Sequence, residues 1–399
     1  MKYVIVLGDG MADEPIEALN GSTPLYAAHT PCMDDMATKS EIGLVHTIPE
    51  GMQPGSDTAN LAVLGYYPRK YYTGRSPLEA LSIGVDMLPT DIALRCNIVT
   101  VSEEEDYEHK TIIDHSSSEI STEDASILLD AVKKELENDI YKYYVGTSYR
   151  HLTIWNCGKV VDLTPPHDIL GKVIGGYLPT EPALKEMMKK SFEILNNHPL
   201  NIDRAKHGLN KANSIWFWGA GTRPALDNFF EKTGKKGAMI SAVDLLKGIA
   251  VGAGMKVIQV EGANGTLHTN YIGKAKASVR ALLQDDYDFV YVHVEAPDEM
   301  GHQGSVERKI QAIEYLDEQV IKVIKEDMEQ AKADYRMLVL PDHPTPIACR
   351  THTSDPVPYM LYDSTKPQKN IQLYNEKEAA TTGNVFKEGY TLIDYLLEK

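Results

Sequence analysis

Short apolar runs that end in glycine, aspartate or proline recur along this chain of 399 residues, and they constrain its fold more than any other feature. The first, KYVIVLG at 2–8, is continuously apolar, which is the pattern of a strand buried on both faces of a parallel sheet. We therefore expect an α/β fold with a doubly wound, mostly parallel sheet. The later runs are NSIWFWGAG (213–221), KKGAMISA (235–242), MKVIQVEG (255–262), YDFVYVHV (287–294) and YRMLVL (335–340).

The character of the sequence changes between these runs. From about residue 91 it contains the acidic stretch SEEEDYEH, an amphipathic helical pattern at 123–138 and two strand-like runs, YKYYVGTSY and HLTIWNCG. This mixture predicts a smaller α+β insertion over residues 91–209. The core domain would then be discontinuous, formed by residues 1–90 and 210–399, with the sheet resuming at SIWFWG.

The composition excludes several classes of partner. With 40 basic and 57 acidic side chains the formal charge is -17, which repels nucleic acid and anionic lipid. The four cysteines form no CxxC pair, and no apolar run is long enough for a signal-peptide core or a membrane span. We therefore expect a cytoplasmic protein with neither nucleic acid nor membrane as a partner, whose oligomeric state the sequence does not indicate.

Carboxylates and histidines near the two ends of the chain are of the types that bind divalent metals. The four-residue step from Asp298 to His302 can return both side chains to one point through a Gly-containing turn. Asp342 and His343 can share a site only on an irregular backbone, which the flanking prolines favour. Taken singly, each residue could be a helix cap or a satisfied surface side chain. The predicted ligands are Asp9, Asp298, His302, Asp342, His343 and His352.

These residues follow strands at what should be one edge of one sheet, where α/β folds bind their ligands. Two metals at such a site can clamp the oxygens of a phosphoryl group during transfer. The segment PEGMQPGSDTANLAVLGY places Ser56 at the start of a helix-like run, near free amides and the positive end of the helix dipole. Ser56 could merely cap that helix. Beside a metal set, we interpret it as a nucleophile that carries phosphate.

Other phosphate and nucleophile motifs are missing from the sequence. GDGMAD is not a GxGxxG loop, no GxxxxGK[ST] is present, and the Gly-Ser-Asp around Ser56 is not a GxSxG elbow. A P-loop is therefore excluded, and the missing elbow argues against an α/β-hydrolase.

Five motifs resemble the archaeal type of cofactor-independent phosphoglycerate mutase, a member of the alkaline phosphatase superfamily. They are VLGDGMAD, MQPGSDTANLAVLGY, HVEAPDEMGHQG, LPDHPTP and RTHTSDPVP. The similarity extends over nearly the whole chain, including YYTGRSPLEA, TSYRHL, SAVDLLKGIA and TNYIGKA. The resemblance implies an alkaline-phosphatase-like sheet, with the insertion as a substrate-capping domain.

The resemblance also implies how the two metals are held and what they do. One ion would be bound by Asp298, His302 and His352, and the other by Asp9, Asp342, His343 and the Ser56 oxygen. We expect manganese, with zinc, magnesium or cobalt as alternatives. By the family's mechanism Ser56 takes the phosphate of 3-phosphoglycerate, and the retained glycerate takes it back on its 2-hydroxyl, without bisphosphoglycerate.

Such a mechanism needs cationic groups for the glycerate carboxylate and a general acid or base. Each candidate could instead be a solvated surface charge. The candidates are His115, Arg150, His151, His167, Asp168 and Lys274.

The same motifs leave one other function open and argue against two more. Bacterial relatives with this motif set are often proposed to be homoserine kinases of threonine biosynthesis, and nothing in the metal site separates them from mutases. A phosphatase would need water at Ser56, which a capping insertion would exclude. A metal-binding regulatory protein without turnover would not need the nucleophile.

Overall fold

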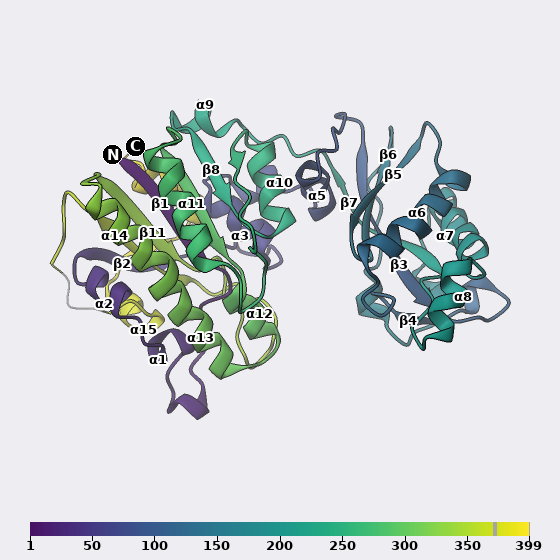
Figure 1. Ribbon diagram of the computed structural model, residues 1–399, viewed down its shortest axis with the longest axis horizontal. Coiled ribbons are helices and arrows are strands. Elements are labelled where there is room, and N and C mark those ends of the chain that lie inside the picture. Colours follow the sequence, from purple (N-terminus) through teal and green to yellow (C-terminus); the bar gives the residue numbers. More distant parts are fainter. Residues whose placement is uncertain (370–372, 399) are drawn as a thin grey trace. The chain divides into compact units, whose positions relative to one another are not determined.

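The structure is a computed structural model that describes residues 1–369 and 373–398, and it divides into two compact units. Unit 1 contains Met1–Tyr72 and Ala225–Lys399, and unit 2 contains Thr73–Pro224. Figure 1 shows both units coloured along the chain. Within the described ranges, no helix combines the length and the apolar character that crossing a membrane would require.

Unit 1 is built on an eight-stranded sheet in which five of the seven neighbouring pairs are parallel. The strand β1 (Lys2–Gly8) lies in the middle, between two parallel neighbours, because its apolar run can be buried on both faces. In order across the sheet the strands are β13 (Val385–Phe386), β2 (Ser40–Val45), β12 (Val357–Asp363), β11 (Tyr335–Leu340), β1, β10 (Phe289–Val294), β8 (Gly237–Ile240) and β9 (Lys256–Val257).

Helices cover this sheet. One face packs Val4, Val290 and Met337 against α2 (Pro31–Ala37), α11 (Tyr271–Leu283), α13 (Val306–Leu316) and α14 (Lys322–Gln330). The last three are the green helices beside the purple β1 in Figure 1. The remaining α-helices of unit 1 are α1 (Pro24–Ala27), α3 (Ser56–Val63), α4 (Pro68–Tyr71), α9 (Phe229–Thr233), α10 (Asp244–Gly252), α12 (Ala296–His302), α15 (Glu376–Thr381) and α16 (Leu392–Leu396).

Unit 2 is an α+β unit with its own apolar core. Its sheet contains β4 (Ile112–Asp114), β3 (Ile92–Val101), β6 (Arg150–Trp155) and β5 (Tyr141–Thr147) in that order, and β7 (Ser214–Thr222) also pairs with β3. Its α-helices are α5 (Arg75–Ser82), α6 (Thr122–Leu136), α7 (Pro182–Leu195) and α8 (Pro199–Lys206). The helix predicted at 123–138 corresponds to α6, and the two strand-like runs correspond to β5 and β6.

The fold class expected from the sequence is confirmed, but the structure differs from the expectation in three details. The run SIWFWG was expected to resume the core sheet, whereas it forms β7 and pairs antiparallel with β3 inside unit 2. Because β7 and α5 both pack on β3, unit 2 begins at Thr73 and ends at Pro224 rather than at residues 91 and 209. The predicted strand at 255–262 is also short, since β9 has two residues.

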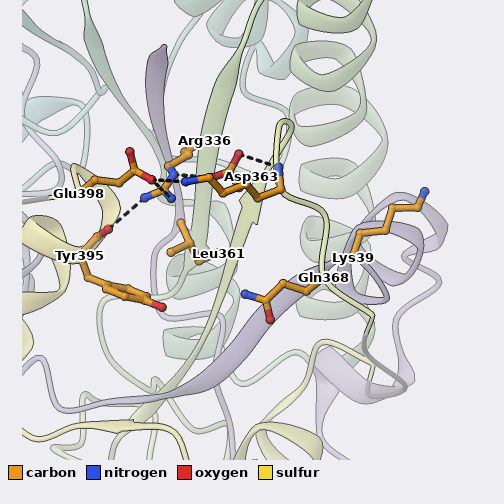
Figure 2. Close-up of a pocket in the computed structure, with 8 residues that line it drawn as sticks. Lys39, Arg336, Leu361, Asp363, Gln368, Tyr395 and Glu398 are labelled. Carbon is orange, nitrogen blue, oxygen red and sulfur yellow. Dashed lines mark hydrogen bonds and ion pairs between the residues drawn. The ribbon is translucent and has the colours of Figure 1, made fainter.

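The end of the described chain is anchored to the sheet by Arg336 of β11. Its guanidinium donates to Asp363 Oδ2 on β12 at 2.7 Å, to the carbonyl oxygen of Tyr395 in α16 at 3.2 Å, and to Glu398. Figure 2 shows these side chains around a surface pocket. Arg336 lies near the start of β11, so this anchor is at the opposite end of the strand from Asp342.

Candidate metal and phosphoryl-transfer site

The predicted metal ligands lie where β1, β10 and β11 end, at the carboxyl edge of three adjacent parallel strands. Asp9 directly follows β1, and Asp342 and His343 follow β11 on a backbone with no helix or strand. Asp298 and His302 lie on the short helix α12 after β10, rather than on the turn that the sequence suggested. Residues four apart share one face of a helix, so the helix also brings the two side chains together.

The first cluster joins the predicted nucleophile to three ligands. His343 Nε2 lies 3.1 Å from Ser56 Oγ, 3.4 Å from Asp342 Oδ2 and 3.6 Å from Asp9 Oδ1. Ser56 is the first residue of α3, so its hydroxyl is at the helix N-terminus. One ligand atom each from Asp9, Asp342 and His343 fall within 4.8 Å of one another, close enough to share an ion.

The second cluster gathers around Asp298. His302 Nε2 lies 3.2 Å from Asp298 Oδ2 and 3.0 Å from His352 Nε2, and His352 Nε2 lies 3.4 Å from Asp298 Oδ1. His343 also has a ligand atom within 4.8 Å of Asp298 and His352, so its ring lies between the two clusters. The other ring nitrogen of His302 is 2.9 Å from the carbonyl oxygen of Arg350, which fixes the ring's orientation.

The buried carboxylates of these clusters favour the binding of cations. Burial raises the pKa of Asp9 well above its ordinary value, and the charges of Asp342 and Asp298 raise it further. Asp9 Oδ1 is buried and has no hydrogen-bond partner among the described residues. Burial alone would also raise the pKa of Asp298, but hydrogen bonds from His302 and His352 hold it well below the ordinary value.

These residues fit a pair of divalent metal ions. A buried carboxylate oxygen without a donor, and imidazole nitrogens that face carboxylates at 3–4 Å, are what a metal site presents before its ion is bound. The donor set of carboxylate oxygen, imidazole nitrogen and a hydroxyl suits manganese, zinc, magnesium or cobalt.

Several residues that the sequence analysis did not select form hydrogen bonds with the predicted ligands and orient them. His293 Nε2 lies 2.9 Å from Asp9 Oδ2, while its Nδ1 lies 3.1 Å from Ser241 Oγ. Thr345 donates through its hydroxyl to Asp298 Oδ1 at 2.5 Å. Asn60 donates to Asp342 Oδ2 at 2.9 Å. Only His293 had a visible signal, since it interrupts the apolar run of β10.

The substrate candidates fall into separate places. On unit 2, the ring of His115 lies 5.7 Å from that of Tyr149 and 6.2 Å from that of His167. The His167 ring lies 5.3 Å from Trp218, which in turn stacks under the guanidinium of Arg95. These contacts define an aromatic and cationic cluster on unit 2.

The other candidates differ in exposure and partners. Arg150 is exposed and lies over the Tyr149 ring, and Asp168 lies 3.7 Å from His167. His151 instead pairs in register with Cys96, and burial lowers its pKa to about 4. Lys274 belongs to unit 1, where it is fully buried and donates to the carbonyl oxygen of His293 at 3.0 Å. Burial lowers the pKa of Lys274 to about 8.

Comparison with known proteins gives a consistent result. The family model described as 2,3-bisphosphoglycerate-independent phosphoglycerate mutase matches residues 37–201. A protein of that name from Methanosarcina mazei is 46% identical over 404 residues, covering 100% of both chains. The solved structure of a protein from Pyrococcus horikoshii covers 100% of this chain and 96% of its own, at 30% identity and a TM-score of 0.82.

A second solved structure is also named as a phosphoglycerate mutase. The cofactor-independent phosphoglycerate mutase from Thermoplasma acidophilum covers 100% of this chain and 99% of its own, with 26% identity and a TM-score of 0.67. The similarity to the Methanosarcina protein extends over the full length of both chains, so it spans both units. The chain therefore belongs to the family of 2,3-bisphosphoglycerate-independent phosphoglycerate mutases.

Proposed function

We propose that this chain interconverts 3-phosphoglycerate and 2-phosphoglycerate, in glycolysis and gluconeogenesis in the cytoplasm, through a phosphoserine at Ser56. The observation that carries the proposal is the position of Ser56 Oγ, 3.1 Å from His343 Nε2 and at the N-terminus of α3. A hydroxyl held beside two metal-ligand clusters, at the positive end of a helix dipole, suits a nucleophile that becomes an anion.

Two divalent ions complete the proposed site. We propose that Asp9, Asp342, His343 and Ser56 hold one, and that Asp298, His302 and His352 hold the other, with manganese as the expected metal. When bound, such ions neutralise the phosphoryl oxygens and lower the pKa of the serine hydroxyl. His293 and Thr345 keep Asp9 and Asp298 oriented through their hydrogen bonds.

In the first half-reaction Ser56 Oγ attacks phosphorus, its bond to phosphorus forms, and the bond from phosphorus to the 3-oxygen of the substrate breaks. That oxygen takes a proton as Ser56 gives one up. In the second half-reaction the 2-hydroxyl of the retained glycerate attacks the phosphoserine and loses its proton, and Ser56 is restored with a proton. Net change is the movement of one phosphoryl group, so no bisphosphoglycerate is needed.

The glycerate must be held between the two halves. We propose that groups of the insertion bind its carboxylate, and the unit 2 cluster around His115 and His167 offers suitable side chains, with Arg150 and Asp168 beside it. The guanidinium of Arg95 is already paired with the Glu79 carboxylate. His115 Nδ1 is buried and finds no hydrogen-bond partner in the described part of the chain, as expected of a group that awaits one. His151 fits this role less well because it is buried within the unit.

A coupled assay tests the proposal. The full chain, supplied with manganese and without bisphosphoglycerate, should convert 3-phosphoglycerate into 2-phosphoglycerate, and a chelator should stop it. A parallel assay follows phosphohomoserine from homoserine and ATP. Product in the second assay alone would leave the site as described and transfer its function to amino-acid phosphorylation.

Removal of the nucleophile tests the intermediate. Ser56→Ala should bind manganese nearly as well as the wild type but lose mutase activity by several orders of magnitude, because no other group can carry the phosphate. Ser126→Ala, in the first half of α6 on unit 2, is the matched control and should keep full activity. More than about a tenth of the wild-type rate in Ser56→Ala would contradict the phosphoserine mechanism.

A further inference from the structure

We propose that Tyr291 and Asn60 are positioning residues that together set the orientation of the Asp342 carboxylate and of the start of the nucleophile helix. Tyr291 lies on β10 and Asn60 on α3, and both side chains are completely buried. Neither is among the predicted ligands. The inference rests on the proposed function only in assuming that a divalent metal binds at Asp342.

The hydrogen bonds around Asn60 can run in one direction only. Its amide nitrogen lies 2.8 Å from the carbonyl oxygen of Ser56 and 2.9 Å from Asp342 Oδ2, and both of these atoms are acceptors. The amide nitrogen must therefore face them as the donor. The amide oxygen is then left to accept from the Tyr291 hydroxyl, 2.5 Å away. By donating to the amide oxygen, the tyrosine stabilises the orientation in which the amide nitrogen faces the carboxylate.

Most acceptor positions of the Asp342 carboxylate are occupied by hydrogen-bond donors from the chain. Its Oδ1 accepts from the backbone amides of Gly10 at 3.1 Å and His343 at 3.0 Å. Its Oδ2 accepts from Asn60 and lies 3.4 Å from His343 Nε2. A carboxylate has about four acceptor positions, so three are occupied and one on Oδ2 is left for an ion. The hydrogen bond from Asn60 thereby determines which Asp342 oxygen, and which of its acceptor positions, remains available to a metal ion.

The same amide also holds the nucleophile. The bond from Asn60 to the carbonyl oxygen of Ser56 spans one turn of α3 and ties the first residue of the helix to Asp342. A side chain that holds both the nucleophile's backbone and a ligand keeps their separation fixed, as a preorganised site requires. An ordinary core contact between a tyrosine and an asparagine would not need this geometry, and it would affect stability alone.

Manganese binding separates the two roles. The full chain is stripped with a chelator, and Mn²⁺ is titrated while free ion is followed by electron paramagnetic resonance. Tyr291→Phe should weaken one of the two sites about tenfold and leave the other unchanged, because outer hydrogen bonds to a ligand are typically worth 10–100-fold in affinity. Saturating Mn²⁺ should then restore turnover, which a merely structural defect would not allow.

Tyr374→Phe is the matched control. Its hydroxyl is also buried, 3.0 Å from the carbonyl oxygen of Pro358 and 3.2 Å from that of Val339, and its hydrogen bonds within the described residues are to these backbone atoms rather than to a predicted ligand. The control should lose thermal stability to a similar degree while both Mn²⁺ affinities stay at the wild-type value. If Tyr291→Phe matches the control in both measurements, the positioning role is wrong and the contact is ordinary packing.

A double substitution tests whether Tyr291 acts on the metal site through Asn60. Because Tyr291 acts through Asn60, adding Tyr291→Phe to Asn60→Ala should change Mn²⁺ affinity no further. A further tenfold loss in the double variant would show that Tyr291 reaches the site by another route, and would overturn the proposal. The titration uses no substrate, so failure of the mutase assay would not affect its outcome.

Discussion

Lys309 provides the sharpest test of how the ligand loops are held. It lies on α13 and is fully buried. Its ammonium donates to Asp13 Oδ2 at 2.8 Å, to the carbonyl oxygen of Thr345 at 2.9 Å and to that of Ala12 at 3.2 Å. One side chain therefore joins the loop after Asp9 to the loop after Asp342.

Lys309→Met keeps most of the side-chain volume and removes the charge. The Asp13 carboxylate would remain buried without its cation, which costs about 3–5 kcal/mol in the free energy of unfolding. Ala12 would keep a donor, because its carbonyl oxygen also accepts from the Thr345 amide, but the Thr345 carbonyl would lose the only donor found for it among the described residues. That single buried acceptor costs about 1–3 kcal/mol.

A second substitution separates the cost of the unpaired charge from the cost of the lost hydrogen bond. In Lys309→Met with Asp13→Asn the buried charge is gone, while the asparagine oxygen can still accept from the amides of Glu14 and Ile347. The double variant should therefore recover roughly 2 kcal/mol relative to Lys309→Met alone.

Calorimetry of the metal-free chain measures both variants. The chain has three tryptophans, at positions 155, 216 and 218, and all lie in unit 2. Tryptophan fluorescence therefore identifies the unit 2 transition, and the loss should appear in the transition of unit 1. A double variant no more stable than Lys309→Met would refute the argument, because the cost would then not come from an unpaired charge.

Three further predictions concern separate parts of the chain. His352→Ala should leave about one Mn²⁺ per chain in a metal analysis, since Asp298 loses a neighbouring ligand, and two retained ions would remove His352 from the set. Burial would raise the pKa of Asp114, but donors including the Ser116 amide lower it from 3.8 to about 2. Its stabilising effect on unit 2 is present above pH 3.8 and lost as the pH falls towards 2, so Asp114→Asn should flatten the acid titration of tryptophan fluorescence in that window. Arg336→Met should destabilise unit 1 by about 3 kcal/mol in calorimetry and leave Mn²⁺ affinity unchanged, because Arg336 lies roughly 20 Å along β11 from the site.

The sequence predicted the centre of the fold because one physical rule links pattern to position. Continuous apolar runs indicate strands buried on both faces, and the carboxyl ends of parallel strands meet at one edge. The proximity of Asp9, Asp298 and Asp342 could therefore be predicted from the sequence. The pairing of β7 could not, since SIWFWG is apolar enough for either sheet and carries no information about its partner strand.

The supporting residues were hidden for a different reason. Lysines and asparagines at helical positions are usually exposed, so nothing in the sequence distinguishes Lys309 or Asn60 from a solvated side chain. Their burial depends on where α13 and α3 pack, which is a property of the tertiary structure. The helical form of α12 was missed because Gly301 suggested a turn, although an isolated glycine is tolerated within a helix.

The balance of charge connects the fold to the chemistry. Asp9, Asp298 and Asp342 are all buried, and in the described part of the chain their ion pairs are with histidines rather than with lysine or arginine. The hydrogen bond to Asp298 raises the pKa of His302 to about 9, so this ring can offset one carboxylate, but burial lowers the pKa of His293 and of His343 and works against protonating them. The nearby Lys274 ammonium donates to a backbone carbonyl instead. The folded chain therefore holds an excess of negative charge at the end of its central strands, which divalent cations can offset while leaving Ser56 beside them.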